Sequence, residues 1–118
     1  GEFQDLKIGN KKLYQVVAEK VATEWNKNQN CSVVVGATYP KELKDVRSII
    51  GDMPILIPGI GAQGGDLEAT VNAGKDSKNQ GMIINSSRGI IFASSGENFA
   101  EAARAETEKL HKQIQKYL

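Results

Sequence analysis

The sequence predicts an α/β fold in which parallel strands alternate with helices, corresponding to about half of a (βα)8 barrel. Helical and strand-like segments alternate along the chain, and the strand-like segments are short continuous apolar runs, as in sheets covered on both faces. Each helix–strand unit takes about 25 to 30 residues, and a complete barrel needs roughly 250. The 118 residues therefore form one segment holding about half a barrel, although segment order alone also permits a small open three-layer sheet.

The first half of the chain predicts two helices and one strand. Apolar side chains recur every four residues from Leu13, which indicates a helix with one apolar face over Lys11–Trp25. The β-branched run Val33–Val35 predicts a buried strand. A second helix is expected over Pro40–Ile50, because proline suits the first helical position and Gly51 supplies a stop.

The second half repeats the pattern. Ile55–Ile57 and Met82–Ile84 predict two further strands, and Asp66 can cap a short helix that ends near Gly74. A long final helix is expected from about Asn98 to Tyr117. The apolar residues that we expect this last helix to bury are Phe99, Ala102, Ala103, Leu110 and Ile114.

Composition disfavours several classes of function. A net charge of +1 lacks the excess of Lys and Arg that nucleic-acid binding requires. The single cysteine, Cys31, can form neither an intrachain disulfide nor a multi-thiolate metal site, so no metal site is expected. No apolar stretch approaches the roughly 18 residues of a membrane span, and the chain start shows no signal pattern. We therefore expect no membrane association and a location in the reducing cytoplasm.

Two loops that follow predicted strands contain the residue types that suit phosphate binding. The first, Pro58–Asp66, is rich in glycine and leads into a helix, so its backbone N–H groups can surround phosphate oxygens. The second, Ser86–Gly89, offers an arginine fork beside two hydroxyls. Because the phosphate site of such barrels is often built by the loops after the last two strands, Gln63 and Arg88 are expected to converge on one phosphate.

The first loop also fits the dinucleotide-binding pattern, with glycines at Gly59, Gly61 and Gly64. That alternative requires an acidic residue at the end of the next strand to hold a ribose. The next strand ends in Asn85 and Ser86, so the dinucleotide interpretation is disfavoured.

Three motifs resemble a known family. Val35–Pro40 (VGATYP), Leu56–Asp66 (LIPGIGAQGGD) and Ser87–Ile90 (SRGI) are similar to the C-terminal half of orotidine 5′-monophosphate decarboxylase, in its longer bacterial branch. The similarity runs over essentially the whole chain. It implies the C-terminal half of a (βα)8 TIM barrel from an enzyme of pyrimidine biosynthesis. Such lyases convert orotidine monophosphate to uridine monophosphate and CO2 without metal or organic cofactor, usually as homodimers.

The resemblance also implies roles for individual residues. Gln63 and Arg88 would contact the 5′-phosphate of the nucleoside monophosphate, with the backbone N–H groups of Gly65 and Gly89 nearby. Pro58 and Ile60 would line the pyrimidine end of the pocket.

The catalytic Lys/Asp motif of that family, Asp-x-Lys-x-x-Asp, is not expected in this chain. Asp5-Leu6-Lys7 and Asp76-Ser77-Lys78 both fit Asp-x-Lys, but Asn10 and Gly81 stand where the second Asp should be. We therefore expect no catalytic residue here, an inactive chain when alone, and assembly as a homo-oligomer or with an N-terminal half. Two alternatives remain open: a stand-alone phosphate-binding half-barrel without catalysis, and another phosphosugar enzyme of the same barrel superfamily.

Overall fold

The centre of the molecule is a parallel sheet of three strands. The computed structural model describes residues 1–61 and 65–118. Strands β3 (Val33–Val34), β4 (Ile55–Pro58) and β5 (Met82–Asn85) lie in the order β3-β4-β5, and both neighbouring pairs are parallel. The predicted parallel arrangement is confirmed, and each apolar run of the sequence contributes a strand.

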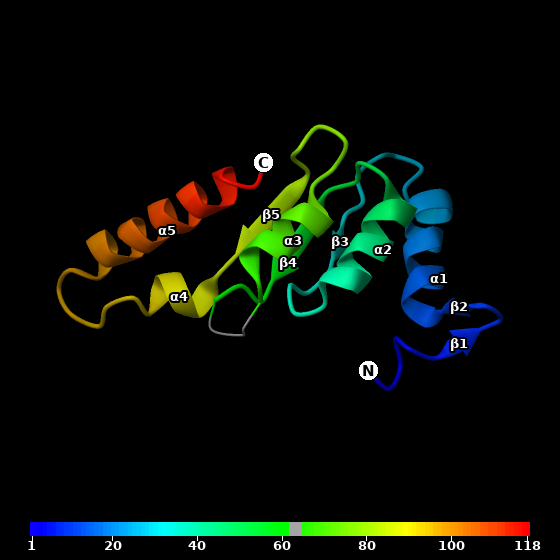
Figure 1. Ribbon diagram of the computed structural model, residues 1–118, viewed down its shortest axis with the longest axis horizontal. Helices are drawn as coiled ribbons and strands as arrows, with labels where there is room; N and C mark the ends of the chain where they lie inside the picture. Colours follow the sequence, from blue (N-terminus) through cyan, green and yellow to red (C-terminus); the bar gives the residue numbers. More distant parts are fainter. Residues whose placement is uncertain (62–64) are drawn as a thin grey trace.

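Two helices cover one face of this sheet (Figure 1). Helix α2 (Pro40–Ile50) begins at a proline, and α3 (Leu67–Gly74) is capped by Asp66, whose Oδ1 accepts a hydrogen bond from the Ala69 N–H at 3.0 Å. The apolar face of α2 meets the strand residues that point the same way. The core contains Leu43, Val46, Ile50, Met53, Ile55, Ile57 and Ala73.

The opposite face of the sheet is open. Side chains alternate along a strand, and Val34, Leu56 and Ile83 are register partners on the side away from α2 and α3. Val34 is 65% exposed and Ile83 is 60% exposed. The prediction of a buried strand over 33–35 is therefore wrong for its central residue, because the apolar run indicated two covered faces and the described helices α2 and α3 cover only one.

The N-terminal region is more divided than predicted. A short antiparallel hairpin of β1 (Lys7–Ile8) and β2 (Lys11–Lys12) precedes helix α1 (Leu13–Lys20). The helix then continues as one π-helical turn, η1 (Val21–Trp25). The predicted helix is thus confirmed from Leu13 onward, and α1 packs beside α2 (Figure 1).

The C-terminal region departs from prediction in two ways. The predicted loop Ser86–Gly89 contains the start of a short helix, α4 (Ser87–Ile91). The final helix, α5 (Phe99–Gln115), buries none of its residues fully, and Phe99 is 62% exposed. Helical periodicity identifies an apolar face but does not ensure that another element covers it. Within residues 1–61 and 65–118, no helix has both the length and the apolar character needed to cross a membrane.

One arginine joins the helix ends to the strand starts. The guanidinium of Arg47, on α2, donates hydrogen bonds to four backbone carbonyls. They belong to Gly74 (2.7 Å), Gly51 (2.7 Å), Met53 (2.6 Å) and Gly81 (3.1 Å). These carbonyls lie at the ends of α2 and α3 and just before β4 and β5. Burial lowers the Arg47 pKa, but an arginine stays charged, so these are charge-assisted bonds.

We expect Arg47→Lys to lower the free energy of unfolding by about 2 to 4 kcal/mol, because an ammonium cannot reproduce the planar fork that reaches all four carbonyls. Urea denaturation followed by circular dichroism measures the change. The matched control is Arg104→Lys, since Arg104 is 81% exposed on α5, and it should change stability by about 0.5 kcal/mol or less. Equal effects of the two substitutions would contradict the role assigned to Arg47.

Candidate functional site

A cavity of about 160 Å³ opens where β4 and β5 end. The two strands run parallel with Pro58 paired to Asn85, so the segments that follow them emerge side by side. The residues that line the cavity are Pro58, Gly59, Ile60, Asn85, Ser86, Ser87, Arg88 and Gly89. The cavity therefore forms between the two loops that the sequence singled out.

Four of the six predicted site residues line this cavity: Pro58, Ile60, Arg88 and Gly89. Ile60 is 8% exposed and also belongs to the hydrophobic core, which anchors that side of the wall. Gln63 lies outside the described residues. The sequence argument singled out neither Gly59 nor Asn85 as a site residue, although their positions next to Pro58 and Ser86 could have suggested it.

The glycine loop is held by close backbone packing. Gly59 has φ 102° and Gly61 has φ 81°, a region that favours glycine. Gly65 lies so close to its neighbours that an added Cβ would stand 2.7 Å from the Gly59 carbonyl oxygen and 2.8 Å from the Ala37 side chain. The Gly65 N–H donates to the Gly59 carbonyl at 3.2 Å. In this structure that N–H is engaged within the loop, and Gly65 is not part of the described cavity lining.

Ser86 lies between the two loops. Its Oγ would be 2.7 Å from a Cβ added at Gly89 and 3.7 Å from one added at Gly61. A side chain at Gly89 would therefore displace the Ser86 hydroxyl. The absence of a side chain there lets the start of α4 approach the end of β5, and Gly89 stands in the first helical turn, where backbone N–H groups lack helical partners.

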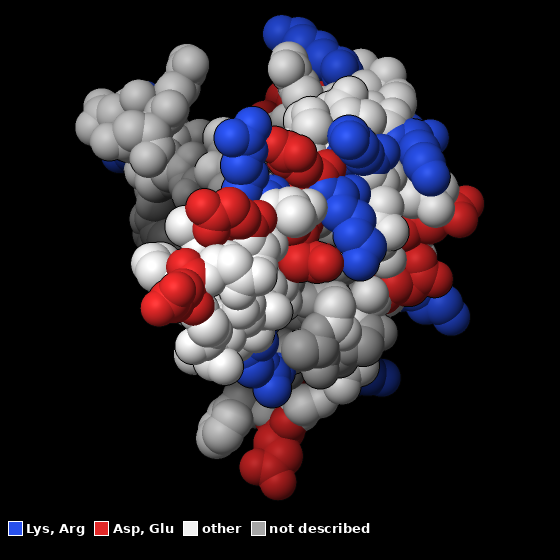
Figure 2. All heavy atoms as spheres, turned by 90° about the vertical axis from the view of Figure 1, so that its left-hand side faces the viewer, with Lys and Arg blue, Asp and Glu red and all other residues white. Residues whose placement is uncertain are grey.

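Arg88 supplies the positive charge of the site. Its side chain belongs to an exposed residue, and among the ion pairs of the described residues none involves it. The cavity lining includes no acidic residue among those described. Figure 2 shows Lys, Arg, Asp and Glu interspersed over the end of the molecule that carries α4 and α5. On this face the charges are mixed, so the positive charge beside the cavity is local to Arg88.

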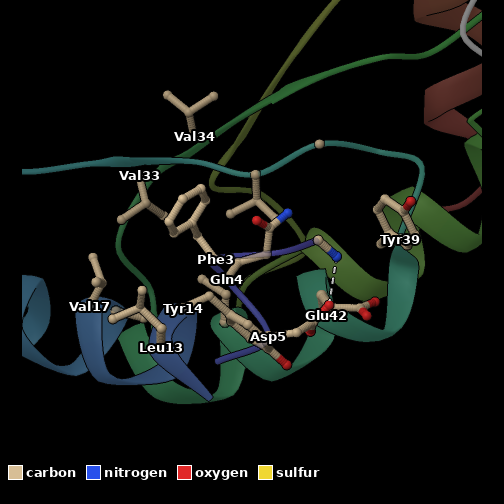
Figure 3. Close-up of a pocket in the computed structure, with 15 residues that line it drawn as sticks. Phe3, Gln4, Asp5, Leu13, Tyr14, Val17, Val33, Val34, Tyr39 and Glu42 are labelled. Atoms are coloured by element: carbon tan, nitrogen blue, oxygen red, sulfur yellow. Dashed lines mark hydrogen bonds and ion pairs between the residues drawn. The ribbon is translucent and has the colours of Figure 1, made fainter. Parts of the chain in front are cut away.

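A second, larger cavity of about 490 Å³ lies beside strand β3, among residues 3–5, α1, β3 and α2 (Figure 3). Its walls include the apolar side chains of Phe3, Val17 and Val33. Tyr14, also in the wall, donates a hydrogen bond to Asp45 Oδ2 at 2.9 Å, and burial with this bond raises its pKa to about 12. The tyrosine stays neutral at ordinary pH, and the same wall also contains the carboxyl groups of Asp5 and Glu42.

Among residues 1–61 and 65–118, no group of three His, Cys, Asp or Glu side chains is placed to hold a metal ion. The one described buried polar side-chain atom without a hydrogen bond is Asn85 Oδ1, in the cavity wall. The described lining offers a ligand the Arg88 guanidinium, the hydroxyls of Ser86 and Ser87, the Asn85 amide and backbone groups.

Comparison with known proteins identifies the family. The family model for the Orotidine 5'-phosphate decarboxylase / HUMPS family matches residues 1–105. The chain belongs to this family. The resemblance noted from the VGATYP, LIPGIGAQGGD and SRGI motifs is thereby confirmed.

Relatives named orotidine 5′-phosphate decarboxylase are about half identical to the chain. The protein from Janthinobacterium sp. (strain Marseille) is 52% identical over 117 residues, covering 99% of this chain and 43% of the relative. The protein from Azoarcus sp. (strain BH72) is 56% identical over 104 residues, covering 88% of this chain and 38% of the relative. The chain thus spans about two-fifths of the length of these curated relatives.

Solved structures of the family share the fold. The UMP synthase of Leishmania donovani superposes with a TM-score of 0.83 at 38% identity, covering 98% of this chain and 24% of that protein. The OMP decarboxylase of the same organism gives a TM-score of 0.78 at 36% identity, covering 96% and 43%. The predicted fold class is confirmed: the three parallel strands and their helices are part of an α/β barrel.

We expect Gly65→Ala to destabilise the chain by about 1 to 3 kcal/mol, because the new methyl group would overlap the Gly59 carbonyl and Ala37. Thermal unfolding measures the effect. Gly36→Ala is the matched control, since the nearest atom to its added Cβ is 3.9 Å away, and it should be neutral or slightly stabilising. If both substitutions behave alike, the glycine loop is not closely packed against Ala37.

Proposed function

We propose that this chain supplies the 5′-phosphate-binding part of an orotidine 5′-monophosphate decarboxylase, the carboxy-lyase that forms uridine monophosphate and CO2 in pyrimidine biosynthesis. The observation that carries the proposal is the cavity at the ends of β4 and β5, which gathers Pro58, Ile60, Arg88 and Gly89 from two loops. Family membership supports the same reading, because the matched relatives carry the name of this enzyme. A cytoplasmic location remains a prediction.

Each group at the cavity suits a part of the nucleotide. The Arg88 guanidinium can donate two parallel hydrogen bonds to phosphate oxygens, and the first-turn N–H of Gly89 adds a third donor. We infer that Gln63 contacts the same phosphate, as the motif suggests. A contribution from the Gly65 N–H would require exchange of its bond to Gly59. Pro58 and Ile60 give the apolar wall beside which a pyrimidine ring would lie.

Phosphate binding helps a reaction at the distant pyrimidine ring only through other groups. Binding energy from a non-reacting part of a substrate accelerates chemistry when it positions the reacting atoms against a proton donor and a carboxylate. The cavity lining contains no Lys, Asp or Glu among its described residues. We therefore propose that this chain binds the nucleotide and does not decarboxylate it when alone.

We expect Arg88→Ala to lower the affinity for uridine monophosphate by roughly tenfold to a hundredfold, since a charge-assisted bidentate contact contributes on the order of 1.5 to 3 kcal/mol. Isothermal titration calorimetry with uridine monophosphate and with inorganic phosphate measures both affinities. Arg104→Ala, on the exposed face of α5, is the control for loss of one positive charge. Unchanged affinity in Arg88→Ala would remove this residue from the site, and turnover of orotidine monophosphate by the unsubstituted chain would contradict the proposed division of roles.

We further propose that the open face of the sheet pairs with another polypeptide, either a second copy of this chain or the remaining part of the barrel. Val34 and Ile83 expose apolar side chains there, and the outer edges of β3 and β5 have no strand beside them within the described sheet. Unpaired edges beside an apolar face promote association. Light scattering across a dilution series should show dimers or larger species, and a cooperatively folded monomer at micromolar concentration would contradict the pairing.

A further inference from the structure

The segment 35–40, which carries the VGATYP motif, follows β3 and is tied to the wall of the cavity at the ends of β4 and β5. At its centre, Ala37 is 0% exposed. The Ala37 N–H donates a hydrogen bond to the Pro58 carbonyl at 2.8 Å. Pro58 is the last residue of β4 and lines the cavity, whereas Ala37 is not part of the described lining. The motif therefore contacts the cavity wall from outside the cavity.

Ala37 also supports the glycine loop through its side chain. A Cβ added at Gly65 would lie 2.8 Å from the Ala37 Cβ, so the backbone of Gly65 packs directly against that methyl group. Gly65 in turn donates its N–H to the Gly59 carbonyl at 3.2 Å, and Gly59 lines the cavity. One small buried residue thus contacts the glycine loop on both sides of its described part.

A buried hydroxyl holds Ala37 from the helix that follows the loop. Thr70, on α3, is 0% exposed, and it is the buried polar residue of the described part of the chain. Its Oγ1 donates a long hydrogen bond, 3.5 Å, to the Ala37 carbonyl. A threonine within a helix commonly bonds a carbonyl of its own preceding turn, as Thr107 does with Ala103 at 2.8 Å. Thr70 instead links α3 to the segment that supports the glycine loop.

We propose that Thr70 is a positioning residue for phosphate binding, because its hydroxyl holds Ala37, and Ala37 holds Pro58 and Gly65 in place beside the cavity. The inference rests on the proposed function, since it takes the cavity that contains Arg88 to be the phosphate site. Thr70 is not among the described residues that line this cavity, so it acts through Ala37 and does not touch the ligand. A binding site whose supporting residues are loosened loses affinity even when every ligand-contacting group is still present.

The test separates the hydroxyl of Thr70 from its size. Thr70→Val keeps the volume and removes the hydroxyl, Thr70→Ser keeps the hydroxyl and removes a methyl group, and Thr70→Ala removes both. In calorimetry, we expect Thr70→Val and Thr70→Ala to weaken the binding of uridine monophosphate and of inorganic phosphate by about threefold to tenfold, and Thr70→Ser to change both affinities by less than about twofold. The melting temperature should follow size instead, with Thr70→Ser and Thr70→Ala below Thr70→Val, because both lose a buried methyl group.

Thr107→Val is the matched control, since it also removes a threonine hydroxyl that bonds a backbone carbonyl, but on the exposed face of α5. It should alter neither affinity. The proposal is overturned if affinity follows melting temperature across the Thr70 variants, if Thr70→Ser binds as weakly as Thr70→Ala, or if all three bind like the unsubstituted chain. Failure of both hydroxyl-free variants to fold would assign the hydroxyl to the fold alone and would also overturn it. If the unsubstituted chain binds neither uridine monophosphate nor phosphate, the proposed function itself fails.

Discussion

The fold of this chain depends on one guanidinium that satisfies four backbone carbonyls. Arg47 reaches from α2 to the carbonyls that end α2 and α3 and to those that precede β4 and β5. Helix ends leave carbonyls without intrahelical partners, and here a single planar donor fork serves both helices at once. Because the bonds to Gly74 and Gly81 reach 27 and 34 residues along the chain, the arginine helps to hold the two strand–helix units against each other.

The contacts of Arg47 at the starts of β4 and β5 influence which residues lie side by side where these strands end. Arg47 donates hydrogen bonds to the carbonyls of Met53 and Gly81, which precede β4 and β5. These bonds favour the register that pairs Ile55 with Met82 and therefore Pro58 with Asn85. A slip of one residue would turn every side chain of β5 to the other face, exchanging Asn85 with Ile84. The position of the cavity at one end of β4 and β5 is thus linked to the Arg47 contacts at the other end of the same strands.

Local patterns were sufficient to predict the three strands of the parallel sheet and the Asp66 cap, because each depends on neighbouring residues. The role of Arg47 was not predictable in this way: its partners are backbone carbonyls, which any residue type supplies, and their convergence is tertiary. Helix α4 was missed because Ser87, Arg88 and Gly89 resemble a loop, and glycine and serine are poor helix formers. The prediction that Phe99 is buried was wrong. An apolar helical face is buried only where another element packs against it, and no described element covers Phe99.

The residues that line the cavity also differ in how far the sequence alone predicts them. Pro58, Ile60, Arg88 and Gly89 meet because two parallel strands end together, and strand order alone predicts that. Asn85 lines the cavity as well, and the sequence alone did not single it out, since an Asn at the end of a strand carries no motif. All described lining residues come from residues 58–60 and 85–89, so the cavity needs the β4–β5 pair and not the open edge of β3. The proposed phosphate site is therefore a local arrangement of the two segments that follow adjacent strands.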